Sequence, residues 1–251
     1  MFSPVLRRLL RTLIFRPYRI WSHHQFGKFE RVTQNLRRVQ QAVLFRRIAM
    51  NRETSFGRDH NFAGISKYED FRARVPVTTY EDYEPYINHM KAGRTDALLG
   101  AGQKLVMFAL TSGTQSVRKF IPVTEEYVQE FRRGWFIWGA KACQDHYGML
   151  HGSIVQLASD WDEFRTEAGT PCGSVSGLIA KMQGTLVRRL YCIPSEVARI
   201  KDAAARHYTT MRLAIPRDVS FLSTANPSTV VNLARLGDTE KERLVRDIAD
   251  G

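Results

Sequence analysis

The stretch from Leu105 to Thr124 constrains the fold more than any other part of the sequence. A mostly apolar segment, Leu105–Leu110, is followed by a hydroxyl-rich segment, Thr111–Ser116, and then by a second largely apolar segment that begins at Lys119. Short apolar segments bounded by glycine and hydroxyl residues are typical of buried β-strands joined by a loop. The sequence therefore predicts a strand–loop–strand unit here, with a lysine at the start of the second strand.

The residue types in this loop suit a phosphate group. Small residues let backbone N–H groups approach phosphate oxygens, hydroxyl groups donate further hydrogen bonds, and a lysine adds a point charge. The loop is not a Walker loop, because the residue directly before Lys119 is not a glycine. In addition, Phe120 stands where a serine or threonine would hold magnesium. The alternative is an ordinary turn rich in serine and threonine, which is what most such loops are.

Thr111–Thr114, Lys119 and Ile121–Thr124 together resemble the first nucleotide-binding motif of the acyl-adenylate-forming enzymes. More narrowly, the sequence is similar to the bacterial branch of the Gretchen Hagen (auxin-responsive promoter) family of acyl-acid amido synthetases. Other segments that match this family in order and spacing are Thr54–Phe62, Phe71–Tyr83, Tyr208–Ala214 and Val219–Thr229.

The resemblance implies an α/β fold, namely an incomplete N-terminal domain of an adenylate-forming enzyme with mixed sheets flanked by helices. We expect a helical arm over residues 1–50 and the front part of the adenylation domain over residues 51–251. Family members run to roughly twice this length. The later motifs that contact adenine, magnesium and ribose are absent from this sequence, so we expect the chain to correspond to the front half of the enzyme.

For the complete enzyme, the family implies that a carboxylic acid reacts with ATP to give an acyl-adenylate, and that an amine, typically an amino acid, then takes the acyl group as an amide. ATP and Mg²⁺ are the implied cofactors. The residues implied to surround the nucleotide phosphates are Thr111, Ser112, the backbone of Gly113, Thr114, Gln115 and Ser116, with Lys119 anchoring the loop or neutralising the leaving pyrophosphate. Gln115 and Ser116 depart from the Thr-Gly pair that is common at this place, which restricts the backbone angles of the loop.

Three alternatives stay open. The chain could be a catalytically inactive truncated paralogue that binds a nucleotide weakly, or its acceptor could be a thiol, as in acyl-coenzyme A ligases. A third alternative is a nucleic-acid or membrane-surface binder, because residues 1–50 carry eleven Lys and Arg residues against the single acid Glu30, in a chain of net charge +12. An arginine-rich helix face is more often simply solvated. We therefore expect no nucleic-acid partner and no stable membrane insertion.

Two helices are expected in the basic arm. The first covers Phe2–Phe15 and should end at Pro17, because proline lacks the N–H that continues a helix. The second covers about Gln25–Met50. The three cysteines of the chain are widely spaced and odd in number, which argues against a disulfide framework and favours a reducing, cytoplasmic compartment.

Helix boundaries are marked further along the chain. Thr79, Thr124 and Asn226 are predicted N-caps, and Gly237 is predicted to stop the helix that Asn226 begins. Several side chains are weaker site candidates: an aromatic row that either lines an acyl pocket or belongs to the core, two arginines that could meet a carboxylate, and two serines that could face the cleft. These residues are Phe131, Trp135, Trp138, Arg132, Arg133, Ser174 and Ser176.

Overall fold

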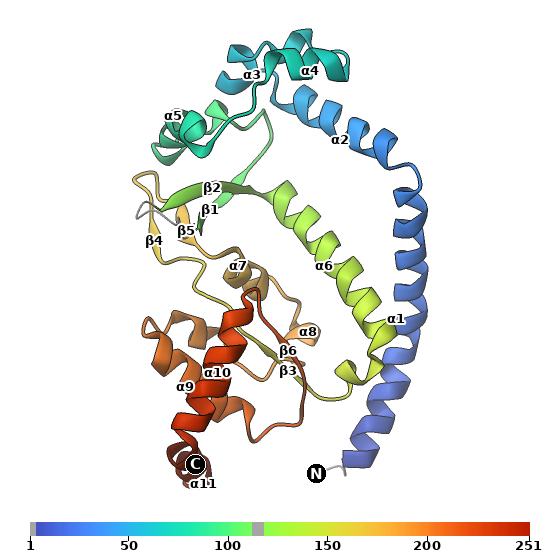
Figure 1. Cartoon of the computed structure of the whole chain (residues 1–251), viewed down its shortest axis with the longest axis vertical. Coiled ribbons are helices and arrows are strands. Elements are labelled where there is room, and N and C mark those ends of the chain that lie inside the picture. The colour runs from blue at the N-terminus through green and yellow to red at the C-terminus, as the bar shows by residue number, and fades with distance from the viewer. Residues whose placement is uncertain (1–3, 112–117) are drawn as a thin grey trace. The chain divides into compact units, whose positions relative to one another are not determined.

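The computed structural model describes residues 4–111 and 118–251 (Figure 1). The chain divides into two compact units, which we name after their sheets. The four-strand unit is formed by Gly27–Gly134 and Trp161–Gly173, and the two-strand unit by Met1–Phe26, Trp135–Asp160 and Ser174–Gly251. Both units combine helices with a small sheet, which confirms the prediction of an α/β fold.

Helices make up most of the regular structure in the described residues. The α-helices are α1 (Pro4–Thr33), α2 (Leu36–Asn51), α3 (Ser55–Asp59), α4 (Tyr68–Arg74), α5 (Tyr80–Lys91), α6 (Glu125–Asp145), α7 (Val175–Lys181), α8 (Thr185–Arg188), α9 (Ala203–Ala214), α10 (Pro227–Thr239) and α11 (Lys241–Ala249). Short 3-10 helices are η1 (Phe62–Gly64), η2 (Thr95–Ala97), η3 (Tyr147–Leu150) and η4 (Ser195–Arg199). The strands are β1 (Leu105–Thr111), β2 (Lys119–Thr124), β3 (Ser153–Gln156), β4 (Phe164–Arg165), β5 (Pro171–Gly173) and β6 (Val219–Ser223).

The sheet of the four-strand unit has the order β2-β1-β5-β4, with β1 antiparallel to β2 and parallel to β5. Met107 and Phe108 are adjacent on β1, so their side chains point to opposite faces, and both have no exposed surface. Phe108 packs with Cys172 of β5 and with Ile87 and Met90 of α5. Strand β1 is therefore covered on both faces, which gives the loop that follows it a rigid support.

The sheet of the two-strand unit pairs β3 and β6 in parallel. Ile154 and Val155 of β3 are buried, and helices α9, α10 and α11 pack together with Leu233 and Leu244 in their interior. The Tyr208 hydroxyl of α9 donates a hydrogen bond to the Asp247 carboxylate of α11 (2.6 Å), so polar contacts also join these helices.

The predicted helix end at Pro17 is wrong, because α1 continues through this residue to Thr33. A proline inside a helix costs one backbone hydrogen bond. The residues around it offset that loss: Phe15 and Tyr18 pack on a buried cluster that contains Met149, and Ser22 is fully buried. The second predicted helix starts later than expected, since the chain leaves helical geometry at Asn35 and α2 begins at Leu36.

Gly237 does not end the helix that Asn226 begins, which is also a correction. The cap itself is confirmed, because the Asn226 side chain accepts a hydrogen bond from the Ser228 N–H and Pro227 occupies the first turn. Helix α10 nevertheless runs to Thr239, and Gly237 lacks the positive φ with which a glycine ends a helix. A Cβ at Gly237 would lie 2.9 Å from the Met211 Cε atom of α9. Because this atom is the flexible end of a methionine side chain, it can shift, and the contact does not by itself require glycine.

Candidate functional site

The predicted phosphate loop connects the two strands of the β1–β2 hairpin. Thr111 ends β1 and Lys119 begins β2, and the two residues are register partners in the antiparallel ladder. The predicted site residues Ser112, Gly113, Thr114, Gln115 and Ser116 lie outside the described residues. Of the predicted set, the structure therefore describes Thr111, which is exposed, and Lys119, which is partly buried. It brings these two together at the end of the hairpin where the loop begins, which we call the hairpin mouth.

Lys119 lies beside the first turn of helix α5. Its ammonium nitrogen is 3.6 Å from the Glu81 carboxylate and 5.0 Å from the centre of the Tyr80 ring. The ring offers its negative face to the ammonium group, and the carboxylate adds an opposite charge. These two contacts hold the ammonium group near the hairpin mouth. Because 39% of the Lys119 side chain is exposed, the group stays accessible to solvent.

Tyr80 also binds the backbone of the strand that carries Lys119. The Phe120 N–H donates a hydrogen bond to the Tyr80 hydroxyl oxygen at 2.8 Å. Strand β2 is the edge strand of its sheet, so an N–H that points away from β1 has no ladder partner. Tyr80 satisfies this donor. Partial burial of the phenol is the main cause that raises the pKa of Tyr80 above its ordinary value, so the hydroxyl stays protonated at neutral pH.

The start of helix α5 holds Tyr80 and Glu81 in place. Thr79 is the N-cap, as predicted, and its backbone N–H (2.7 Å) and hydroxyl (3.1 Å) both donate to the Asp82 carboxylate. The pKa of Glu81 lies below its ordinary value, first because its own backbone N–H binds the carboxylate, then because of the Thr79 hydroxyl, with Lys119 a smaller cause. Glu81 is therefore ionised at neutral pH and can pair with the lysine.

Two further cations lie beside the hairpin: Arg118 directly precedes β2, and Lys91 is the last residue of helix α5. Arg118 is 3.4 Å from the Glu163 carboxylate and lies over the Phe164 ring of β4, with 6.0 Å between its guanidinium carbon and the ring centre. The Lys91 ammonium group lies 4.5 Å from the centre of the Phe120 ring. Sequence reasoning missed Arg118, Lys91 and Tyr80 as parts of this region. Only Arg118, next to Lys119, carried a local signal, because the other two reach the hairpin through tertiary packing.

The remaining candidates belong to the two-strand unit or to helix α6. The hydroxyls of Ser174 and Ser176 hydrogen-bond to each other at 2.8 Å, with Ser174 as the N-cap of α7. The rings of Trp135 and Trp138 form an edge-to-face pair with centres 5.0 Å apart, and Trp138 lies 6.1 Å from Phe221. Trp135 is 39% exposed and Trp138 48% exposed, so neither is a fully buried core residue.

Arg132 and Arg133 on α6 are exposed. The predicted N-cap of this helix is confirmed, because the Tyr127 N–H donates to the Thr124 hydroxyl oxygen at 3.1 Å. Within residues 4–111 and 118–251, no three His, Cys, Asp or Glu side chains come together as a metal-binding group. None of the helices described there has both the length and the apolar character that a bilayer crossing requires.

Comparison with known proteins gives a consistent result. Residues 25–251 match the GH3 family N-terminal domain. The jasmonoyl–L-amino acid synthetase GH3.3 of Oryza sativa subsp. japonica is 28% identical over 232 residues, which cover 89% of this chain and 50% of that protein. The probable indole-3-acetic acid-amido synthetase GH3.1 of Arabidopsis thaliana is 33% identical over 201 residues, covering 77% of this chain and 34% of that protein.

A solved structure of the GH3.15 acyl acid amido synthetase has the same fold, with a TM-score of 0.77 at 20% identity over 89% of this chain and 40% of that one. The chain thus spans half or less of the length of these relatives. The resemblance that the loop and its flanking segments indicated is confirmed. The chain belongs to the GH3 family, and residues 25–251 correspond to its N-terminal domain.

Proposed function

We propose that this chain supplies the nucleotide-phosphate loop of an enzyme that activates a small carboxylic acid with ATP and then joins it to an amino acid as an amide. Family membership supports this proposal, as do the names of the relatives, which are amido synthetases for jasmonate or indole-3-acetate. The observation that carries it is the pairing of Thr111 with Lys119 at the mouth of the hairpin. This pairing brings both ends of the loop, and the lysine, to the end of the buried strand β1.

The first step of the proposed reaction moves negative charge. A carboxylate oxygen attacks the α-phosphorus of ATP, the bond from that phosphorus to the oxygen bridging it to the β-phosphorus breaks, and pyrophosphate leaves. Preorganised donors that face the developing charge lower the barrier of such a step. In the proposal these donors are the hydroxyls of Thr111, Ser112 and Thr114 and the Gly113 N–H, with Gln115 and Ser116 completing the loop and Lys119 neutralising the departing phosphates.

Lys119 must exchange partners for this role. In the structure its ammonium group pairs with Glu81 at 3.6 Å, and 67% of the Glu81 side chain is exposed. Exposed ion pairs of this kind contribute little to stability, because water screens the two charges. A triphosphate, with several negative charges, can therefore compete with Glu81 for the lysine at small cost. Tyr80 would keep the lysine close to the loop during this exchange.

The described residues contain no group of side chains that could bind the implied Mg²⁺. Two carboxylates beside the hairpin, Glu81 and Glu163, already pair with Lys119 and Arg118, and no group of metal-binding side chains occurs in the described ranges. The described residues thus do not fit a magnesium site of their own. In the proposal the ion arrives with the nucleotide phosphates.

Nucleotide binding by the 251-residue chain tests the proposal. We expect calorimetry to show ATP binding that Lys119→Ala weakens about tenfold or more, because a charge-assisted phosphate contact is lost. Lys104→Ala is the matched control. Lys104 belongs to the same unit and lies 4.0 Å from Glu125 at the exposed surface, so its loss should change affinity by less than about twofold.

Equal affinity of the wild type and Lys119→Ala would contradict the role of the lysine. If a folded wild-type chain bound no nucleotide at all, the alternative of an inactive remnant would replace the proposed activity.

A further inference from the structure

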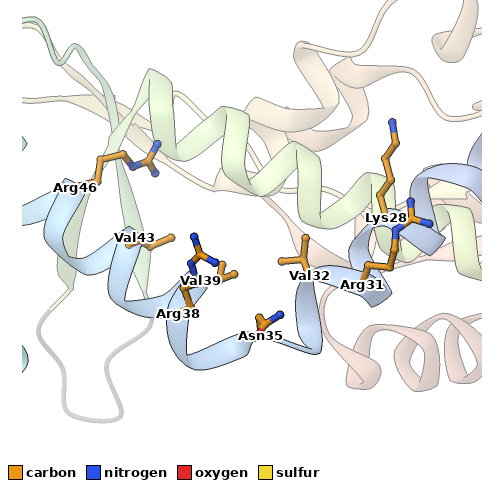
Figure 2. A pocket seen from close by; sticks show the side chains of 9 residues that line it. Lys28, Arg31, Val32, Asn35, Arg38, Val39, Val43 and Arg46 are labelled. Atoms are coloured by element: carbon orange, nitrogen blue, oxygen red, sulfur yellow. The ribbon is translucent and has the colours of Figure 1, made fainter.

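A groove with basic edges follows the junction of helices α1 and α2 in the four-strand unit (Figure 2). It is shallow and open to solvent, with a volume of about 680 Å³. Figure 2 shows Lys28 and Arg31 at one end of the groove, Asn35 at the break between the helices and Arg46 at the other end. The residues that line it are Lys28, Arg31, Val32, Asn35, Arg38, Val39, Ala42, Val43 and Arg46.

The cations of this groove fall into two groups. Arg46 is held by the carboxylates of Glu126 and Glu130 on α6, at 3.3 and 3.1 Å. Lys28, Arg31 and Arg38, by contrast, make no ion pair within the described ranges 4–111 and 118–251, and all three are exposed. Three positive charges therefore face solvent along one groove, none of them within ion-pair distance of a carboxylate among the described residues.

The floor of the groove is apolar. Val32 and Val43 point to the same side of the two helices in Figure 2, with Val39 between them. Val32 is 48% exposed, Val43 is 39% exposed, and Leu36 at the start of α2 is 54% exposed. Apolar side chains this open to water, flanked by unpaired cations, favour a partner that is both anionic and apolar.

We propose that this groove docks the chain peripherally on a membrane surface that contains anionic phospholipid. A phosphate-bearing headgroup would lie among Lys28, Arg31 and Arg38, and the valines would contact the acyl-chain boundary beneath it. Clusters of basic residues on helices recognise anionic lipid in this way. A nucleic acid would satisfy the cations equally well, but its phosphate backbone would leave the valines in water. The lipid therefore accounts for both halves of the groove.

The test is sedimentation of the full 251-residue chain with vesicles of phosphatidylglycerol and phosphatidylcholine, and with vesicles of phosphatidylcholine alone. We expect binding to the anionic vesicles only, weakened by high salt. The triple variant Lys28→Ser, Arg31→Ser, Arg38→Ser should lower the partition coefficient about a hundredfold. The double variant Val32→Ser, Val43→Ser keeps the charge and should lower it about tenfold.

A second triple variant controls for net charge. Arg189, Arg199 and Lys201 are exposed residues of the two-strand unit, and their joint replacement by serine should change binding by less than about threefold. Circular dichroism establishes that each variant is folded.

Three results would overturn the proposal. The first is an equal loss in the two triple variants, and the second is unchanged binding of the valine variant. The third is displacement of the vesicles by a duplex DNA oligonucleotide whose own binding survives the valine changes, which would assign the groove to nucleic acid.

Discussion

Strand β1 lies between two partners, β2 and β5, whereas β6 pairs with β3 on one side and with no other strand of the described ranges. The burial of the two strands follows this difference. Met107 and Phe108 of β1 have no exposed surface, while Val219 and Leu222 of β6 are 39% and 38% exposed. Parallel strands are ordinarily covered on both faces. The candidate loop thus follows a central strand that is paired on both sides and buried, whereas β6 is an edge strand with partly exposed side chains.

The largest expected effect comes from truncating the centre of the closed core. Phe108→Ala should lower the free energy of unfolding by about 3–5 kcal/mol, because it leaves a cavity between β1, β5 and α5. Leu222→Ala on β6 should cost about 1 kcal/mol or less, because that side chain is already partly hydrated. Urea denaturation measures both values. Equal costs would show that β6 is as closely packed as β1 and would contradict this difference between the two strands.

Native-state alkylation compares the same two sheets without mutation. Cys172 lies in β5 and is fully buried, while Cys192 is partly exposed, with its backbone N–H bonded to the Ile154 carbonyl of β3 at 3.0 Å. Burial raises the pKa of both thiols, so their difference in rate should report access. With iodoacetamide at pH 8 and peptide mass spectrometry, we expect Cys192 to react about tenfold faster or more. Comparable rates would mean that the four-strand sheet opens as readily as the other.

Replacing Tyr80 probes how the closed sheet holds the loop lysine. Tyr80→Phe leaves the Phe120 N–H without its acceptor and should lower stability by about 1–2 kcal/mol. ATP affinity should fall only a few-fold, because the aromatic ring beneath Lys119 is retained. Thermal denaturation and calorimetry measure the two effects. The control is Tyr68→Phe on exposed helix α4, which we expect to be neutral, and an equal loss there would remove the special role of Tyr80.

The smallest effect concerns the partner of the lysine. Glu81→Gln should tighten ATP binding by about two- to threefold at pH 7, because Lys119 no longer has to leave a carboxylate. In the wild type the pKa of Glu81 is depressed, so the pair should persist as the pH falls through the ordinary value of 4.5 and be lost only below it. Below that pH the wild type and Glu81→Gln, measured at the same pH, should therefore bind ATP with equal affinity. Weaker binding by Glu81→Gln would instead make Glu81 a residue that orients the lysine.

Local features of the chain could be predicted well from the sequence. The apolar segment Leu105–Leu110 became β1 within one residue, and Thr79, Thr124 and Asn226 cap the helices they were expected to cap. These signals depend on residues only a few positions apart, such as Thr79 and Asp82. Pro17 misled the same reasoning, because residues distant in sequence pack against the helix on both sides of it. Gly237 misled it as well, since α10 continues to Thr239 without a positive φ at the glycine.

The candidate site divides in the same way. The hydroxyl-rich loop, its single glycine and Lys119 were identified from the sequence, and their phosphate-binding role stays a prediction, as does the division of the chain at residue 50. The partners of the lysine could not be identified in this way. Tyr80 and Glu81 lie almost forty residues earlier, and β5, which supports β1, lies some sixty residues later.

Local patterns and composition were enough to predict the family, the α/β class, the strand–loop–strand unit and the basic character of the first fifty residues. The pairing of the strands became clear only in the folded structure. The same holds for the hydrogen bond from the Phe120 N–H of edge strand β2 to the Tyr80 hydroxyl, and for the groove that Lys28, Arg31 and Arg38 share with exposed valines. The physical reason is that pairing and burial are relations between distant segments, and their energies appear only when the segments meet.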